Sequence, residues 1–141
     1  MSEPQTSPSL EGRSVRFETT LSSDAVLSFA ALSGDDHPIH TDETFARASG
    51  LDGRIVQGSL LVGLMAGAST KFFREVARPA LSYGYDRIRF TGQVPLGRKL
   101  SVEYKVTKHD HAERKTWADV QVFEGDRLVA VGQHIAKLLD A

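Results

Sequence analysis

The sequence predicts an α+β domain in which an antiparallel sheet wraps around one long central helix. One strand-like segment comes first, helical segments follow, and alternating segments fill the second half of the chain. The longest helical segment is rich in small and apolar residues, which is typical of a helix enclosed by other elements. A length of 141 residues suits one such domain and leaves little room for a second.

The first half of the chain supplies one strand and two shorter helices. Apolar and charged residues alternate over residues 13–19, which predicts a strand. Ser22 or Ser23 is a possible N-cap for a helix whose apolar residues recur at helical spacing, and Gly34 would end it. After a loop dense in ionisable groups, we expect a short helix over residues 42–49.

The longest predicted helix begins near Gly58 and extends towards Ala77. Its interior contains Gly63 and Gly67, and each interior glycine costs about 1 kcal/mol of helix stability relative to alanine. Two such glycines suggest that another part of the structure approaches the helix backbone closely. A sheet wrapped tightly around the helix would explain them.

The second half of the chain predicts a sheet. Turn residues separate four segments of alternating polarity. The predicted strands cover residues 80–90, 100–108, 116–123 and 127–138. A long helix of small and apolar residues, followed by antiparallel strands able to wrap it, is the outline of a hotdog fold.

Composition and charge exclude several classes of function. Lys and Arg total 17 and Asp and Glu total 18, so the chain lacks the basic charge expected of a nucleic-acid-binding domain. Without cysteine, it has no disulfide, thiolate metal site or cysteine nucleophile. The longest nearly uncharged apolar segment, residues 59–70, is too short to cross a bilayer. We therefore expect a flexible leader over residues 1–12, a single domain over 13–141, and a cytoplasmic protein that binds neither nucleic acid nor membrane.

The segment between Gly34 and His40 carries the residues best suited to chemistry. Asp35 and His40 lie five positions apart in a stretch that Gly34 bends and Pro38 stiffens, so both side chains can meet one small molecule. A carboxylate and an imidazole form an effective pair for moving protons near neutral pH. Adding water to a carbon–carbon double bond requires two proton movements, because water loses a proton and the neighbouring carbon gains one.

The same reaction needs a site for the negative charge that develops on a thioester oxygen. Attack at C3 of a 2-enoyl thioester forms an enolate, which preorganised N–H donors stabilise best. The amino end of the long helix supplies such donors, and Gly58 has no side chain to obstruct its own amide. The sequence thus predicts a proton donor, a proton acceptor and an oxyanion site.

Two motifs resemble those of the MaoC-like family, the (R)-specific enoyl-CoA hydratases. FAALSGDDHPIHTDE, residues 29–43, couples Gly-Asp to Pro-x-His, and IVQGSLL, residues 55–61, is similar to the entry of the hotdog helix. The similarity covers about residues 13–138. It implies that Asp35 and His40 are the catalytic pair and that Gly58 lends its amide to the thioester carbonyl. It also implies a homodimer with acyl-CoA along the subunit interface, and no cofactor beyond the coenzyme A or acyl-carrier thioester of the substrate.

Two positions depart from the common pattern of the family. His37 stands where many members have Asn, and Gln57 stands where many have His directly before the helix-starting glycine. Both side chains can still hydrogen-bond, so both are candidates for orienting the pair. A loop residue without such a role is an equal alternative for His37. The departures leave the substrate class open, and unusual acyl groups or carrier-protein thioesters fit equally well.

The leading hypothesis is reversible hydration of a trans-2-enoyl-CoA to an (R)-3-hydroxyacyl-CoA, without assigning which of Asp35 and His40 is the base. Two alternatives stay open. A hotdog thioesterase would direct water at the thioester carbonyl, and a non-catalytic subunit would bind acyl-CoA without turning it over.

We assign no chemical role to the other clusters of ionisable groups. No metal site is expected at the Asp35 loop, because Pro38 separates its two histidines and no outlying ligand is evident. His109 and His111 have charged neighbours on both sides. We interpret them as part of a solvated hairpin turn.

Overall fold

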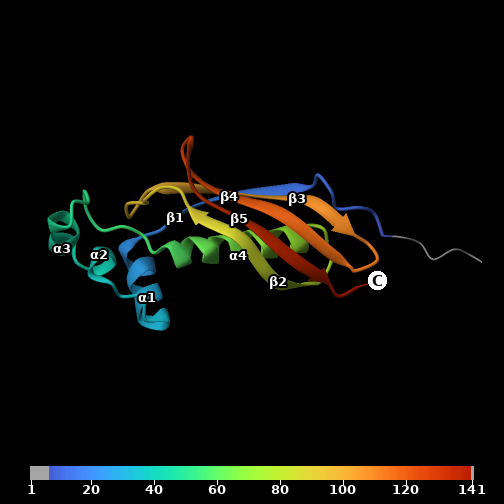
Figure 1. Cartoon of the computed structure of the whole chain (residues 1–141), viewed down its shortest axis with the longest axis horizontal. Helices are drawn as coiled ribbons and strands as arrows, with labels where there is room; N and C mark the ends of the chain where they lie inside the picture. The colour runs from blue at the N-terminus through green and yellow to red at the C-terminus, as the bar shows by residue number, and fades with distance from the viewer. Residues whose placement is uncertain (1–6, 141) are drawn as a thin grey trace, which may run out of the picture.

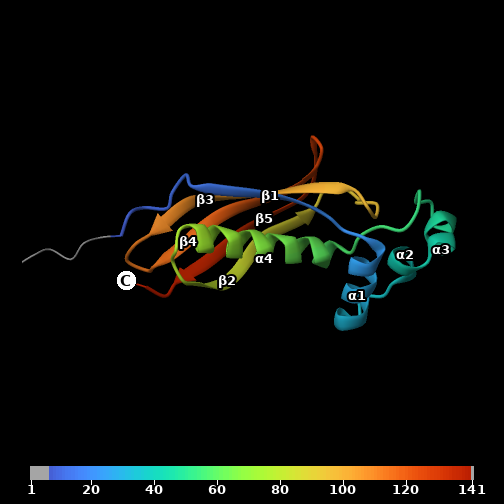
Figure 2. The ribbon, with the colours of Figure 1, turned by 180° about the vertical axis from the view of Figure 1, so that it is seen from behind.

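The computed structural model describes residues 7–140. In chain order the elements are β1 (Ser14–Thr20), α1 (Ser23–Ser33), α2 (Pro38–Thr41), α3 (Glu43–Ala48), α4 (Gly58–Glu75), β2 (Ala80–Phe90), β3 (Lys99–Asp110), β4 (Lys115–Glu124) and β5 (Arg127–Leu138). The five strands form one sheet in the order β1-β3-β4-β5-β2, and neighbouring strands are antiparallel. The sheet curves around α4, while α1, α2 and α3 cluster at the amino end of that helix (Figure 1, Figure 2). The predicted α+β class and its wrapped central helix are confirmed.

The residues that cap the early helices explain where these helices begin and end. The Ser22 hydroxyl accepts a hydrogen bond from the Ala25 amide at the start of α1. Gly34 ends the same helix with a φ of 81°, a left-handed conformation that glycine adopts without strain. The loop expected between Gly34 and His40 contains the one-turn helix α2, which starts at Pro38. Proline suits a first helical position because its ring already holds a helical φ.

The core lies between α4 and the concave face of the sheet. Met65 and Phe72 of α4 are at most 1% exposed, and the Phe72 ring centroid lies 5.3 Å from that of Tyr104 on β3. Full burial of each such side chain stabilises the fold by about 1.5–3 kcal/mol. Within residues 7–140, no helix combines the length and hydrophobicity needed to span a membrane.

The reason predicted for the interior glycines of α4 is wrong. Gly63 and Gly67 are exposed, and a Cβ at either position would have no neighbour within 4 Å outside its own turn of helix. They face away from the sheet and leave an open stripe on the outer side of α4. The close approach occurs instead at Gly132 of β5, where a Cβ would lie 3.3 Å from the Met65 sulfur.

Packed structure begins before residue 13. Leu10 is only 2% exposed, and its amide donates a hydrogen bond to His109 Nδ1 over 3.1 Å. The Glu11 carboxylate accepts from the His109 amide at 3.0 Å. His109 is therefore buried, which corrects its interpretation as a solvated turn residue, and this burial lowers its pKa. Residues 1–6 of the expected leader lie outside the described residues.

Strand β2 forms one edge of the sheet and carries large apolar side chains on its exposed positions. Leu81, Tyr83 and Phe90 are 57%, 64% and 52% exposed. The pairing of β2 with β5 is interrupted between Ser82 and Gly84 and again between Asp86 and Arg89. An unpaired edge that displays apolar side chains is suited to contact with another chain.

Candidate active site

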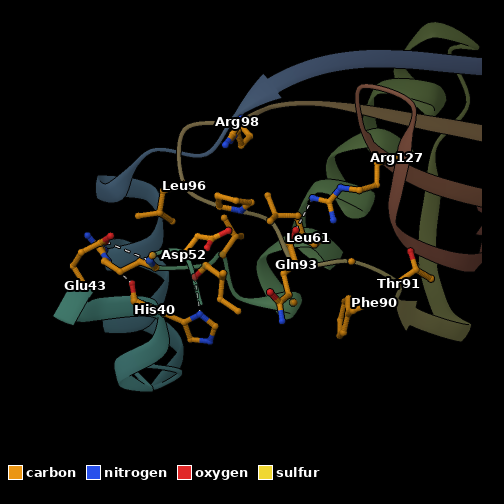
Figure 3. Close-up of a pocket in the computed structure, with 18 residues that line it drawn as sticks. His40, Glu43, Asp52, Leu61, Phe90, Thr91, Gln93, Leu96, Arg98 and Arg127 are labelled. Carbon is orange, nitrogen blue, oxygen red and sulfur yellow. Dashed lines mark hydrogen bonds between the residues drawn. The ribbon is translucent and has the colours of Figure 1, made fainter. Parts of the chain in front are cut away.

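Most of the residues predicted for the site meet at the amino end of α4. A cleft of about 950 Å³ lies there, and His40, Arg54, Gly58 and Phe90 are among the residues that line it (Figure 3). Asp35 adjoins this cleft through His40, because its Oδ1 lies 3.9 Å from His40 Nε2. The structure thus brings together the carboxylate, the imidazole and the helix terminus that the sequence singled out.

The orientation of the His40 ring is set by helix α2 and by the segment that precedes α4. His40 Nδ1 lies 2.7 Å from the carbonyl oxygen of Ile55. Because a carbonyl only accepts hydrogen bonds, Nδ1 must carry the proton that is donated to it. In the neutral ring Nε2 then holds a lone pair, and this nitrogen is the one that faces Asp35. The His40 side chain is 9% exposed, so the protein and not solvent sets this orientation.

Asp35 is held through its backbone while its carboxylate stays accessible. It directly follows the left-handed Gly34, and its amide donates a hydrogen bond to the Ser33 hydroxyl at 3.1 Å. The same hydroxyl donates to the Phe29 carbonyl at 2.6 Å, which ties the loop back to α1. The Asp35 side chain is 41% exposed, so it can meet both water and a ligand.

Gln57 connects three parts of the site from a buried position. Its side chain is fully buried, and Nε2 donates to the Val26 carbonyl at 2.9 Å and to the Asp35 carbonyl at 3.3 Å. Both amide hydrogens are thereby used, and the buried Oε1 has no hydrogen-bond partner among residues 7–140. Gln57 therefore joins α1, the Asp35 loop and the N-cap of α4, where it stands directly before Gly58.

Gly58 is the first residue of α4 and lines the cleft. The first amides of a helix lack acceptors within the helix, and no acceptor is found for the Gly58 amide elsewhere in residues 7–140. A Cβ at this position would lie 2.7 Å from the Phe90 ring. Glycine is thus required for the packing of Phe90 against the helix terminus, a reason that the sequence did not reveal.

Arg54 supports the site in a way that the sequence did not indicate. Its Nε donates to the His40 carbonyl at 2.7 Å, and its Nη1 donates to the Ser23 hydroxyl at 3.0 Å. The guanidinium therefore fixes the end of α2 against the start of α1. These partners are 14 and 31 residues away along the chain, so no local pattern could have identified the role.

His37 caps the helix that carries His40. Its Nδ1 accepts a hydrogen bond from the Ile39 amide at 3.2 Å. Its ring meets the rings of His40 and Phe45 edge-on, with centroid distances of 6.4 and 5.9 Å. It forms no hydrogen bond with the Asp35 or His40 side chain among the described residues. His37 thus supports His40 by ring packing and by capping the start of α2, not by a hydrogen-bonded relay.

Comparisons with known proteins find relatives that cover most of the chain. Residues 6–127 match the family model described as MaoC like domain. The chain is 27% identical over 128 residues to an (R)-specific enoyl-CoA hydratase from Aeromonas caviae, covering 90% of this chain and 93% of that protein. It is also 27% identical over 118 residues to a 3-hydroxybutyryl-CoA dehydratase from Methylorubrum extorquens, covering 84% of this chain and 73% of the relative.

The same relationship appears in three dimensions. A solved structure of an (R)-hydratase from Aeromonas caviae has a TM-score of 0.82 and 26% sequence identity with this chain. The match covers 91% of this chain and 96% of the other. The predicted hotdog fold and the predicted family resemblance are thereby confirmed. The chain belongs to the MaoC-like domain family, a family of hydratases and dehydratases.

Proposed function

We propose that the protein catalyses the reversible hydration of a trans-2-enoyl thioester of coenzyme A to an (R)-3-hydroxyacyl thioester. Asp35 and His40 are its acid–base pair. The observation that carries the proposal is the orientation of His40. Because the Ile55 carbonyl occupies Nδ1, the Nε2 lone pair is left beside the Asp35 carboxylate, 3.9 Å away.

Two neighbouring acceptors suit one water molecule, which has two hydrogens to donate. A water held in this way turns its own lone pairs outward, towards C3 of a bound enoyl group. As its oxygen attacks C3, one member of the pair takes a proton from it. That proton stays within the pair and is delivered to C2, so the hydroxyl and the hydrogen add from one face. General acid–base catalysis of this kind contributes about 10²–10⁴-fold to a rate.

The Gly58 amide stabilises the negative charge that develops on the thioester oxygen during attack. It belongs to the same cleft as His40 and lies at the positive end of an 18-residue helix. In the proposed complex it donates to the thioester oxygen as the enolate forms. Loss of one such donor typically costs about 10²–10³-fold in turnover.

A homodimer joined through β2 is part of the proposal. The exposed edge strand with Leu81, Tyr83 and Phe90 offers a long apolar contact. The open stripe at Gly63 and Gly67 lets another backbone approach α4 closely. Sedimentation equilibrium tests this part, and we expect a mass twice that of the 15.4 kDa chain.

The activity is tested with crotonyl-CoA, followed by loss of the enoyl absorbance, and with chiral separation of the hydroxyacyl product. We expect the (R) isomer. Free thiol released at the same rate would point to a thioesterase, and tight binding without turnover would point to a non-catalytic subunit. Either result, obtained across short, medium and branched enoyl-CoAs, would overturn the hydratase proposal.

A further inference from the structure

A second cavity lies at the carboxyl end of α4, away from Asp35 and His40. Its volume is about 490 Å³, and it is bounded by the last turns of α4, the start of β2 and the end of β5. Polar side chains from all three elements reach it, including Thr70, Arg74, Ser82 and His134. In Figure 2 the start of β2 runs beneath the end of α4, beside β5. The described residues that line it are all different from those that line the catalytic cleft.

A chain of hydrogen bonds leads from the core to the cavity. The Tyr104 hydroxyl lies 2.7 Å from His134 Nδ1, and His134 Nε2 lies 2.8 Å from the Ser82 hydroxyl. Tyr104 is 0% exposed and His134 is 1% exposed, whereas Ser82 is exposed. The Tyr85 ring packs against His134 with a centroid distance of 4.8 Å. Ser82 is thus the solvent-facing end of a chain that starts in the core.

The direction of these hydrogen bonds follows from the burial of Tyr104. Burial raises the pKa of Tyr104, so its hydroxyl keeps its proton, and burial lowers the pKa of His134 to about 4, so its ring is neutral. Within residues 7–140 the Tyr104 hydroxyl has no acceptor other than His134 Nδ1. It therefore donates to Nδ1, which places the ring hydrogen on Nε2. Nε2 donates to the Ser82 oxygen. The Ser82 hydrogen then points either to the neighbouring Tyr85 hydroxyl, whose pKa is raised by burial and lowered in part by this contact, or to a bound ligand.

This direction separates the arrangement from a hydrolytic triad. In a triad a carboxylate accepts from Nδ1, and Nε2 keeps the lone pair that activates serine. Here a tyrosine donates to Nδ1, so Nε2 has no lone pair to offer. Ser82 is consequently an oriented donor and not a nucleophile.

The two cavities become neighbours if the subunits pair as proposed, and the inference rests on that proposed function. Two β2 edges related by a two-fold axis run antiparallel, so the start of one lies beside the end of the other. Ser82 is near the start of β2, and Phe90, which lines the catalytic cleft, is its last residue. The Ser82 cavity of one subunit therefore adjoins the catalytic cleft of its partner.

The charge of the cavity indicates what it would hold. Arg74 and Arg78 line it, and none of the described residues that line it carries a carboxylate. Arg78 is paired with Asp140 at 3.0 Å, which leaves the Arg74 cation unbalanced within the described residues. A hydroxyl donor and a cation together favour a carboxylate.

We propose that the substrate is an enoyl thioester with a carboxylate at the far end of its acyl chain, and that Ser82, oriented by His134 and Tyr104, donates a hydrogen bond to this carboxylate. An acyl group with an apolar end gives the Ser82 hydrogen no acceptor better than Tyr85 and gives Arg74 no counter-charge. The enzyme thus distinguishes substrates by the far end of the acyl chain, while the chemistry at C2 and C3 stays the same.

The test compares six-, eight- and ten-carbon trans-2-enoyl-CoAs, each with and without a terminal carboxylate. For the chain length that reaches the cavity, we expect kcat/KM to be at least about tenfold higher for the dicarboxylic thioester, the effect of one hydrogen bond to a charged group. Ser82→Ala should remove most of this preference, measured as the ratio of kcat/KM between the dicarboxylic and the apolar thioester of the same length. Ser14→Ala, an exposed serine on the opposite edge of the sheet, is the matched control.

The outcomes separate the two proposals. Turnover of both substrate series at equal kcat/KM, or a preference that Ser82→Ala leaves intact, would overturn the carboxylate inference while the hydratase function stands. No turnover of any enoyl-CoA would overturn both. An independent readout is the imidazole ¹⁵N spectrum of the resting protein, in which His134 should be protonated on Nε2. Protonation on Nδ1 would sink the donor role of Ser82, and Tyr104→Phe should weaken the Nε2 preference.

Discussion

A buried histidine lies near each end of α4, and the two neutral rings carry their proton on different nitrogens. At the amino end, His40 Nδ1 donates to the Ile55 carbonyl, so Nε2 faces Asp35 as an acceptor. At the carboxyl end, His134 Nδ1 accepts from the Tyr104 hydroxyl, so Nε2 faces Ser82 as a donor. Both histidine residues are buried, with whole-residue exposures of 7% and 1%.

The difference shows that the group bound to Nδ1 decides whether Nε2 is a hydrogen-bond donor or an acceptor. A carbonyl at Nδ1 produces a ring able to take a proton, and a buried hydroxyl at Nδ1 produces a ring able only to direct a neighbour. A serine beside a histidine is therefore insufficient to identify a nucleophile.

Asp35→Asn should have the largest effect, because it removes the carboxylate partner of His40 and leaves the shape of the site unchanged. We expect kcat/KM for crotonyl-CoA to fall by about 10²–10⁴-fold. The thermal midpoint should hardly change, because the side chain is 41% exposed. Asp36→Asn changes the adjacent carboxylate, which is also exposed, and should keep nearly full activity. A variant at Asp35 that retains a tenth of the activity would remove Asp35 from the pair.

His134 should make the fold less stable in acid. Its pKa is lowered to about 4 in the folded state, so between pH 4 and its ordinary value of 6.5 the unfolded chain binds more protons. The contribution of neutral His134 to the free energy of unfolding should therefore be fully present above pH 6.5 and should be lost as the pH drops towards 4. The loss attributable to His134 is of the order of 3 kcal/mol.

Denaturant titrations at several pH values measure this loss. His134→Gln should flatten the dependence relative to the natural protein. His109 also has a pKa lowered by burial, so His109→Gln is needed to determine its separate share. A His134 variant with an unchanged pH profile would show that the ring is not held neutral.

Gln57→Leu should lower both stability and turnover, because it removes two hydrogen bonds that hold the backbone around Asp35. The Val26 and Asp35 carbonyls would each lose a buried donor, while the unpaired Oε1 would disappear. The net loss of unfolding free energy should be about 1–2 kcal/mol. Turnover should fall because Asp35 is less well placed, and the same substitution at the partly exposed Gln133 is the control. Equal stability of the two variants would contradict the bridging role.

Gly58→Ala should have the smallest effect on stability and a distinct effect on activity. The added methyl would lie 2.7 Å from the Phe90 ring, so this half-exposed side chain must move. We expect a change in unfolding free energy below about 1 kcal/mol. Turnover should fall several-fold as the ring shifts in the cleft, and Phe90→Ala in the same chain should restore part of it. No effect in the single variant would exclude Phe90 from the site.

Much of the amino-end site could be predicted from the sequence, because its main residues are local. Asp35 and His40 are only five residues apart. The left-handed Gly34 directly precedes Asp35, and Pro38 starts the short helix that carries His40, so each shapes the backbone of its immediate neighbours. The strands over 80–90 and 127–138 were likewise predicted with the bounds that the structure shows. Local patterns determine such features because backbone preference and side-chain alternation act over a few residues.

The carboxyl-end arrangement could not be predicted in this way. His134 is 30 residues from Tyr104 and 52 from Ser82, and neither partner is marked by any pattern around it. The same holds for Gln57 and Arg54, whose partners on α1 are 31 residues away. The burial of His109 under Leu10 also joins segments 99 residues apart.

The order of strands and helices, the family and the closeness of Asp35 to His40 can thus be read from the amino-acid sequence. The folded chain is needed to learn which nitrogen of each histidine carries the proton, which glycines face the sheet and what packs against Gly58. Hydrogen-bond direction and burial depend on groups brought together from distant parts of the chain, whereas propensity and spacing act along it.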